Sequence, residues 1–219
     1  MNPELLRRLR IDGFAIASLS GSALVRSLKR EADWLVGRFT NDGYRSGDYW
    51  SFVLANCGEP VLYRIHNLER QGSKPIADLY TAGPLHDLAR EVLSTPVHAT
   101  ACAMIVKVPF HAARVPWHRD RTSVRPHEVC NLSLFLDASS PGNGCMEFVP
   151  GSHLLPDDVD VIEVSKRGPV QPVPAAAGDV VVHDVRVVHS SGVNPGRSCR
   201  RSIIIEFTPA GFALSRKDG

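Results

Sequence analysis

Residues 177–194, AGDVVVHDVRVVHSSGVN, contain the pattern that decides the fold. Two short apolar runs, Val180–His183 and Val187–His189, follow the turn signal Gly178-Asp179. Apolar runs of this length between turn residues predict short strands. Other runs of the same kind occur from residue 100 onward, at Cys102–Val108, Val129–Leu136, Cys145–Val149 and Ser202–Phe207. Many short strands separated by Gly and Pro turns predict an antiparallel sandwich or barrel.

The first hundred residues show mainly helical patterns. Asn2-Pro3 is a typical helix start, and this helix should end before the turn signal Asp12-Gly13. Phe14–Ala17 is a predicted strand. Apolar residues recur at helical spacing over 24–36, with charged residues on much of the other face, which predicts an amphipathic helix. A third helix is expected at about Leu85–Leu93.

The domain organisation follows from these two halves. Residues 40–60 are rich in Gly, Asp, Asn and aromatic side chains, including Tyr44, Tyr49 and Trp50, and predict a loop. Such a loop serves either as a lid over a site or as ordinary surface. We expect one domain over residues 1–219, because this length suits a single core. A helical N-terminal part, residues 1–100, would carry the lid or substrate segment, and residues 101–210 would form the β core.

The composition limits the class of protein. Hydrophobic residues make up 43% and charged residues 22%, as in globular domains, and the net charge of +2 gives no argument for a nucleic-acid or membrane partner. The five cysteines form no C-x-x-C pair, which predicts buried, reduced thiols rather than a disulfide framework or a zinc site. The charged start MNPELLRRLR lacks the apolar core of a signal peptide, so we expect a cytoplasmic location.

A candidate metal site begins at His118-Arg119-Asp120, which is the only H-x-D in the chain. On an extended segment the first and third residues project to one face, so both can reach one ion. A third ligand must come from elsewhere, and His189 is the best candidate, because it ends an apolar run and is followed by Ser190-Ser191-Gly192. Two imidazoles and one carboxylate on one face of an octahedron favour Fe(II) and oxygen chemistry.

Four stretches carry a resemblance to a known family: PWHRD (116–120), NLSLFLDASSPGNGCMEFVPGSH (131–153), AGDVVVHDVRVVHSSGVN (177–194) and RRSIIIEF (200–207). In this order they resemble the phytanoyl-CoA dioxygenase family of Fe(II)/2-oxoglutarate-dependent oxygenases, which includes natural-product tailoring enzymes. LRIDGFAIAS (9–18) is also similar to the opening of that family. The resemblance implies a mainly β fold with flanking α-helices and a double-stranded β-helix (jelly-roll, cupin-like) core.

The resemblance also implies roles for individual residues. His118, Asp120 and His189 match the metal positions of the family. Arg200 matches the arginine that pairs with the distal carboxylate of 2-oxoglutarate, a sensible match because a guanidinium binds a carboxylate through two hydrogen bonds. Its neighbour Arg201 would face away on a strand.

Ser191 and Asn131 match positions that hydrogen-bond the same cosubstrate. His153 and His183 do not match ligand positions.

The resemblance further implies a reaction with Fe(II), 2-oxoglutarate and O2 that oxidises a small molecule by hydroxylation or by oxidative ring closure. Halogenases of the family lack the carboxylate ligand, so Asp120 argues against that branch. Arg64 and His66 are candidate substrate contacts upstream of the core. The cluster after the metal motif consists of Arg119, Arg121, Arg125 and His127. It could contact an anionic substrate, but a solvated cationic loop is the expectation. A substrate from bacterial secondary metabolism is expected, with sugars among the candidates.

Other functions compete with this one. An epimerase or desaturase of the same fold is not separable from sequence, but the mass of the product would distinguish it. A non-catalytic jelly-roll that binds a metal or small molecule would more often have a degenerate set of ligands. A nucleic-acid demethylase would resemble an Arg followed by a second Arg six residues later, and here Glu206 follows Arg200 at that spacing. A cupin isomerase would bring an H-x-H cluster. The sequence predicts no oligomeric state.

Overall fold

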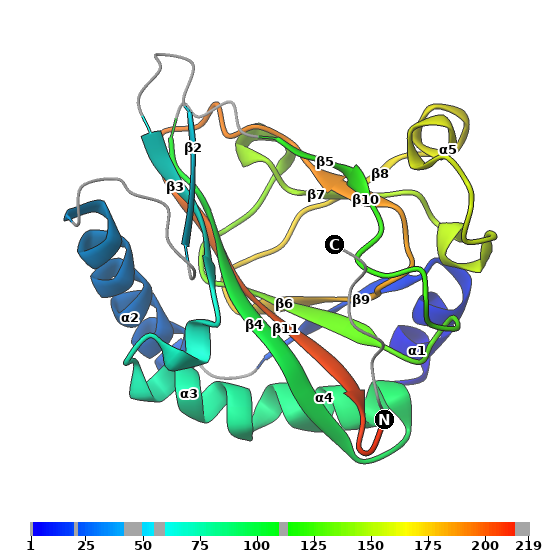
Figure 1. Ribbon diagram of the computed structural model, residues 1–219, viewed down its shortest axis with the longest axis horizontal. Helices are drawn as coiled ribbons and strands as arrows, with labels where there is room; N and C mark the ends of the chain where they lie inside the picture. The colour runs from blue at the N-terminus through cyan, green and yellow to red at the C-terminus, as the bar shows by residue number, and fades with distance from the viewer. Residues whose placement is uncertain (1, 20–21, 42–49, 55–59, 110–113, 213–219) are drawn as a thin grey trace.

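Two antiparallel β-sheets face each other in the computed structural model of the chain (Figure 1), which describes residues 2–19, 22–41, 50–54, 60–109 and 114–212. The large sheet consists, in spatial order, of β1 (Phe14–Ser18), β9 (Asp179–Asp184), β6 (Cys130–Phe135), β11 (Arg200–Pro209), β4 (Val97–Lys107), β3 (Pro60–His66) and β2 (Trp50–Leu54). The small sheet consists of β5 (Val115–His118), β10 (His189–Ser191), β7 (Met146–Phe148) and β8 (Gln171–Val173). The predicted jelly-roll core is therefore confirmed.

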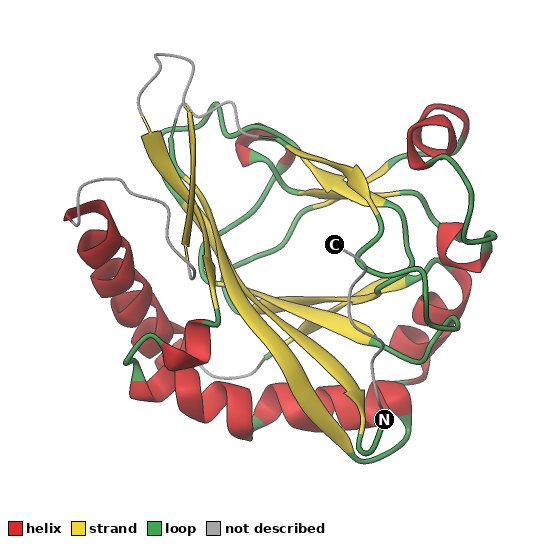
Figure 2. Cartoon of the chain, in the orientation of Figure 1, coloured by secondary structure: helices red, strands yellow, loops and turns green. Residues whose placement is uncertain are grey.

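The helices gather on the side of the large sheet that faces away from the small sheet (Figure 2). They are α1 (Pro3–Ile11), α2 (Ser22–Asn41), α3 (Lys74–Thr81) and α4 (Pro84–Leu93), while α5 (Val161–Arg167) lies beside the small sheet. The Asn2 side chain caps α1 by accepting hydrogen bonds from the backbone of Glu4 and Leu5. None of the helices in the described residues is long and apolar enough to cross a membrane.

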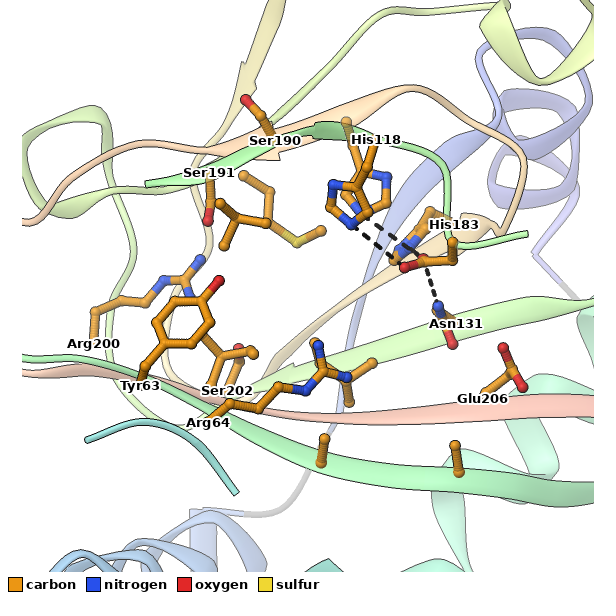
Figure 3. Close-up of a pocket in the computed structure, with 18 residues that line it drawn as sticks. Tyr63, Arg64, His118, Asn131, His183, Ser190, Ser191, Arg200, Ser202 and Glu206 are labelled. Carbon is orange, nitrogen blue, oxygen red and sulfur yellow. Dashed lines mark hydrogen bonds and ion pairs between the residues drawn. The ribbon is translucent and has the colours of Figure 1, made fainter. Parts of the chain in front are cut away.

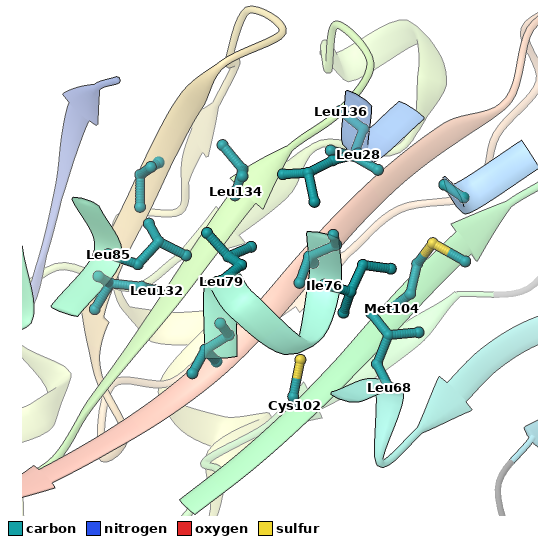
Figure 4. Packing of buried hydrophobic residues seen from close by; sticks show 14 of the residues in the cluster. Leu28, Leu68, Ile76, Leu79, Leu85, Cys102, Met104, Leu132, Leu134 and Leu136 are labelled. Atoms are coloured by element: carbon teal, nitrogen blue, oxygen red, sulfur yellow. The ribbon is translucent and has the colours of Figure 1, made fainter. Parts of the chain in front are cut away.

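Strand alternation divides the interior into two regions. On β11, Ile203, Ile205 and Phe207 point toward the helices and are fully buried, whereas Arg200 and Ser202 point toward the small sheet. Figure 4 shows the helix side of the sheet, where leucines of α2, α3 and α4 pack on leucines of β6. This face supplies most of the hydrophobic core, and the opposite face is left for polar side chains.

A smaller apolar cluster joins the two sheets. The rings of Phe14 and Phe148 stack with their centroids 4.4 Å apart, and Phe135, Val181 and Val187 pack around them. Because this cluster fills one end of the space between the sheets, the remaining space forms a cavity at the other end.

Several expected elements need correction. The loop predicted for residues 40–60 is wrong for Trp50–Leu54, which forms β2 at the edge of the large sheet; Tyr44 and Tyr49 lie outside the described residues. The strand predicted for Val187–His189 exists but is displaced, because residues 185–188 lie in a turn and bend and β10 begins at His189. The helix predicted at Leu85–Leu93 is α4, but α3 before it was not predicted. The strand predicted for Phe14–Ala17 is β1, and the N-terminal part also adds β2 and β3, which were not predicted, to the large sheet.

The core on the helix side generates a first prediction. Leu132 is fully buried between β6 and the helices, so Leu132→Ala should lower the free energy of unfolding by about 2–5 kcal/mol, because it removes methyl groups and leaves a cavity. Leu154→Ala is the matched control, since Leu154 is 57% exposed and its loss should change stability by less than about 0.5 kcal/mol. Denaturant unfolding measures both, and equal effects would contradict this assignment of the core.

The attachment of α2 to the large sheet generates a second prediction. Asp137 accepts a hydrogen bond from Arg201 Nε at 2.7 Å and pairs with Lys29 of α2 at 3.0 Å. Burial alone would raise the pKa of Asp137, but Arg201 and Lys29 outweigh burial and lower it. A lowered pKa in the folded state stabilises the fold above the unfolded pKa, and this contribution is lost as the pH falls through the folded pKa.

Asp137→Asn should therefore destabilise the protein at pH 7, and the difference from wild type should shrink as the pH falls below about 4. Urea unfolding at a series of pH values measures this difference. A difference that does not depend on pH would show that the charge of Asp137 makes no contribution.

Candidate functional site

The structure brings the three predicted metal ligands together at one end of the cavity. His118 ends β5 and His189 begins β10, and the two residues are direct partners across these strands. One ligand atom from each of His118, Asp120 and His189 lies within 4.8 Å of the others. The H-x-D spacing suggested that Asp120 lies on the same strand as His118. Asp120 instead lies in a bend, two residues beyond the end of that strand.

Backbone carbonyls orient both imidazole rings. His118 Nδ1 lies 2.8 Å from the Pro116 carbonyl oxygen, and His189 Nδ1 lies 3.0 Å from that of Val187. Because a carbonyl oxygen only accepts, each Nδ1 must carry the hydrogen, which leaves the Nε2 lone pair for a metal. These Nε2 atoms lie 3.5 and 3.7 Å from the Asp120 carboxylate oxygens. Burial lowers the pKa of His189 to about 3, so this ring is neutral at physiological pH.

The Asp120 carboxylate is held from the opposite, large sheet. Asn131 Nδ2 donates to Asp120 Oδ2 at 2.7 Å, and His183 Nε2 lies 3.1 Å from the same oxygen (Figure 3). Burial alone would raise the pKa of Asp120, but its interactions with His189, His118 and His183 outweigh burial and hold the pKa well below its usual value. The carboxylate is therefore ionised at neutral pH. One carboxylate oxygen beside two imidazole nitrogens is a donor set that fits a divalent iron ion.

The other end of the cavity carries buried positive charge. Arg200 is 2% exposed, and its guanidinium lies 4.9 Å above the Phe135 ring. In Figure 3 it lies at the far side of the cavity from His118 and His183. Burial lowers the pKa of Arg200 to about 10, so it remains a cation at neutral pH. No carboxylate in the described part of the chain forms an ion pair with Arg200, which leaves its charge available to an anion.

Arg201 behaves differently from its neighbour. It points to the helix side, where it pairs with Asp137 and with Asp33 of α2. The predicted opposite orientation of the two arginines is therefore confirmed, and Arg201 supports the fold rather than the cavity.

Ser191 and Asn131 line the same cavity as Arg200. Lys107 on the adjacent strand β4 was not among the predicted site residues. It is 2% exposed, and its Nζ donates to the Gly192 carbonyl oxygen at 2.6 Å. Burial, followed by the charge of Arg200, lowers the pKa of Lys107 to about 7. Strand alternation from Ala101 through Ala103 would have placed Lys107 on the cavity side.

The two predicted substrate contacts upstream of the core, Arg64 and His66, differ in their relation to the cavity. Arg64 on β3 lines the cavity, and its Nε atom is buried without a hydrogen-bond partner. Figure 3 shows Arg64 and Tyr63 extending from this strand into the cavity. His66 is not among the lining residues of the cavity, so its predicted substrate contact is not supported by the described structure.

The arginines that follow the metal motif are not a solvated loop. Arg121 donates to both carboxylate oxygens of Glu206, at 2.7 and 2.9 Å, and the two side chains are only 10% and 6% exposed. Arg119 donates to the backbone of Ser152 and Pro156. Only Arg125, which pairs with a neighbouring glutamate, is highly exposed. The expectation was wrong for Arg119 and Arg121, because their partners come from segments distant in sequence.

Arg186 was also missed, because it lies within an apolar run of the sequence. It is 6% exposed and donates to the carbonyl oxygens of His153, Leu155 and Thr122. These bonds connect the turn before β10 to the loop that follows Asp120. Arg186 therefore supports the segments that carry two of the three candidate ligands.

Comparisons with known proteins agree with this geometry. The model of the phytanoyl-CoA dioxygenase (PhyH) family matches residues 14–202. The crystal structure of AviO1 from Streptomyces viridochromogenes Tue57 is 49% identical, with a TM-score of 0.90 over 97% of this chain and 96% of that chain. The structure of EvdMO1 is 50% identical, with a TM-score of 0.87 over 94% of this chain and 49% of that one.

A curated relative from Stutzerimonas stutzeri, a probable alpha-ketoglutarate-dependent hypophosphite dioxygenase, is 28% identical over 165 residues. These residues are 62% of this chain and 53% of the relative, so the chain spans about half the length of that protein. Alpha-ketoglutarate is 2-oxoglutarate, and the His-Asp-His cluster is a donor set for iron. By family, fold and site, the chain belongs to the phytanoyl-CoA dioxygenase family of iron- and 2-oxoglutarate-dependent oxygenases.

Proposed function

We propose that the chain oxidises an unactivated C–H bond of a small molecule, by hydroxylation or oxidative ring closure, with Fe(II), 2-oxoglutarate and O2. The observation that carries this proposal is one cavity with two complementary ends. One end holds the ligand set His118, Asp120 and His189, and the other end holds the buried cation Arg200. A dicarboxylate that chelates a metal through one end needs a cation at the other end, and the cavity supplies both.

The three candidate ligands would hold the ion from one side. His118 and His189 would present Nε2 and Asp120 a carboxylate oxygen, a donor set that would leave room for cosubstrate and O2. When bound, the ferrous ion supplies the activation of O2 that is coupled to the decarboxylation of 2-oxoglutarate. The protein contributes orientation and exclusion of water around the ligands.

Arg200 would bind the distal carboxylate of 2-oxoglutarate. Its burial excludes competing water, so the attraction between guanidinium and carboxylate is strong. Ser191 lines the same region and offers a hydroxyl group to the cosubstrate. Asn131 remains a proposed contact of the cosubstrate, although its amide Nδ2 already donates to Asp120.

The substrate would occupy the cavity near β3 and β4. Ala101 and Ala103 are small residues on the cavity wall, and they leave space beside the metal ligands. Arg64 brings a cationic group into that space, which favours a substrate with anionic or hydroxyl groups. A sugar-containing molecule of bacterial secondary metabolism, as in antibiotic biosynthesis, fits this chemistry. AviO1, which is 49% identical in sequence, is a Streptomyces protein.

Two further parts of the proposal rest on other features. Free thiols are present at Cys102, Cys130, Cys145 and Cys199, which suits the reducing cytoplasm that we propose as the location.

Epimerisation or desaturation on the same fold would give a product whose mass differs from that of a hydroxylated product. A non-catalytic binding module is disfavoured by the complete ligand set together with Arg200.

The metal site generates a third prediction. Protein reconstituted with Fe(II) under anaerobic conditions and then assayed in the presence of O2 should convert 2-oxoglutarate and O2 to succinate and CO2, and metal-free protein should not. Asp120→Ala should weaken Fe(II) binding by at least about 100-fold, because it removes the one anionic ligand. Asp158→Ala is the matched control, since Asp158 is an exposed carboxylate outside the cavity. Calorimetric metal titration and succinate quantification measure these effects. Undiminished binding by Asp120→Ala would refute the proposed site.

The cosubstrate site generates a fourth prediction. Arg200→Ala should weaken 2-oxoglutarate binding to the Fe(II) protein by about 100-fold, because a buried carboxylate would lose its charged partner. Fe(II) affinity without cosubstrate should stay unchanged. Arg197→Ala, which removes an exposed arginine from the preceding turn, is the control. Titration of the charge-transfer absorption of the anaerobic complex measures the affinity, and a loss of less than threefold would place the distal carboxylate elsewhere.

A further inference from the structure

The candidate ligand Asp120 receives two side-chain hydrogen bonds on one oxygen. Asn131 Nδ2 lies 2.7 Å and His183 Nε2 lies 3.1 Å from Asp120 Oδ2. Asn131 and His183 are direct partners across the antiparallel strands β6 and β9, so their side chains leave the sheet side by side on the cavity face. The large sheet thus donates the hydrogen bonds that hold the Asp120 carboxylate, whereas the other two candidate metal ligands, His118 and His189, belong to the small sheet.

The His183 side chain is held in place by burial and ring contacts, and its hydrogen bond to Asp120 determines which nitrogen carries the hydrogen. It is 1% exposed, and its ring lies 4.8 Å from the His189 ring and 5.5 Å from the Phe148 ring, measured between centroids. An ionised carboxylate only accepts hydrogen bonds, so His183 Nε2 must carry a hydrogen and donate it. A nitrogen that donates to Asp120 has no lone pair for a metal. His183 is therefore not a fourth ligand through this atom.

We propose that His183, with Asn131, is a positioning residue for the metal centre. The two donors occupy Asp120 Oδ2, which also lies 3.7 Å from His189 Nε2, and they leave Oδ1, 3.5 Å from His118 Nε2, as the oxygen without a hydrogen bond from either donor. Asp120 would then bind the metal through Oδ1 alone. This inference rests on the proposed iron site, and it assigns to His183 a role that no ligand motif indicates.

The surrounding backbone supports this role. The Asp120 N–H donates to the Val185 carbonyl oxygen at 2.9 Å, in the turn that directly follows β9. The next residue, Arg121, is paired with Glu206 on β11. Asp120 and Arg121 are thus held by β11 and by the turn after β9, and the bonds from His183 and Asn131 are the contacts that orient the carboxylate itself.

The test compares two substitutions of His183. His183→Phe keeps a ring between its aromatic neighbours but removes the donor, and it should weaken Co(II) and Fe(II) binding by about 10- to 100-fold. His183→Gln restores an N–H donor and should recover most of this loss. His86→Phe is the matched control, because His86 is a partly buried imidazole packed edge-on against Phe207, outside the cavity. It should bind metal like the wild type.

A spectroscopic readout separates positioning from general destabilisation. The visible absorption of the Co(II) protein reports how the carboxylate coordinates, so it should change in His183→Phe and return toward wild type in His183→Gln. If His183→Phe does not fold, Asn131→Ala removes the other donor to the same oxygen and should produce the same change.

Three outcomes would overturn the positioning role: a folded His183→Phe protein with wild-type metal affinity and an unchanged Co(II) spectrum, no recovery by His183→Gln, or an Asn131→Ala protein indistinguishable from wild type. Failure of the wild-type protein itself to bind Co(II) or Fe(II) would instead refute the iron site and the function proposed above.

Discussion

The Asp120 carboxylate is the group on which the two sheets converge. A carboxylate between two sheets must be compensated, because loss of hydration without hydrogen bonds or opposite charge strongly disfavours the ionised form. Here the compensation comes from Asn131 and His183 of the large sheet, and the metal would complete it from the side of His118 and His189. The relative position of the sheets is thus tied to the chemistry that the chain can perform.

The second constraint is the separation of charges within the cavity. Arg200 places positive charge at one end, while the Asp120 carboxylate places negative charge at the other. Arg200 is buried, so its charge contributes little to solubility and remains a cost to folding until an anion binds. A small dicarboxylate with a metal-chelating end matches this pattern better than a neutral or cationic cosubstrate would.

The sequence predicts which residues form much of this site, but the contacts between side chains on different strands depend on how those strands align. Period-two alternation was sufficient to send Arg200 to the cavity and Arg201 to the helices, because it needs only the position of one strand. The pairing of Asn131 with His183 depends on how two distant strands align, which no local pattern specifies. Arg186 lies in an apolar run that resembles a strand, yet its hydrogen bonds to distant carbonyl groups favour a turn. Tertiary contacts overrode local propensity at that point.

The most direct test of this account is a crystal structure grown without oxygen, in the presence of Mn(II) as a substitute for Fe(II) and of 2-oxoglutarate. Anomalous density should show a single ion bound by His118 Nε2, Asp120 Oδ1 and His189 Nε2. The distal carboxylate of 2-oxoglutarate should lie against the Arg200 guanidinium. An ion bound elsewhere, or a cosubstrate whose distal carboxylate avoids Arg200, would contradict the account.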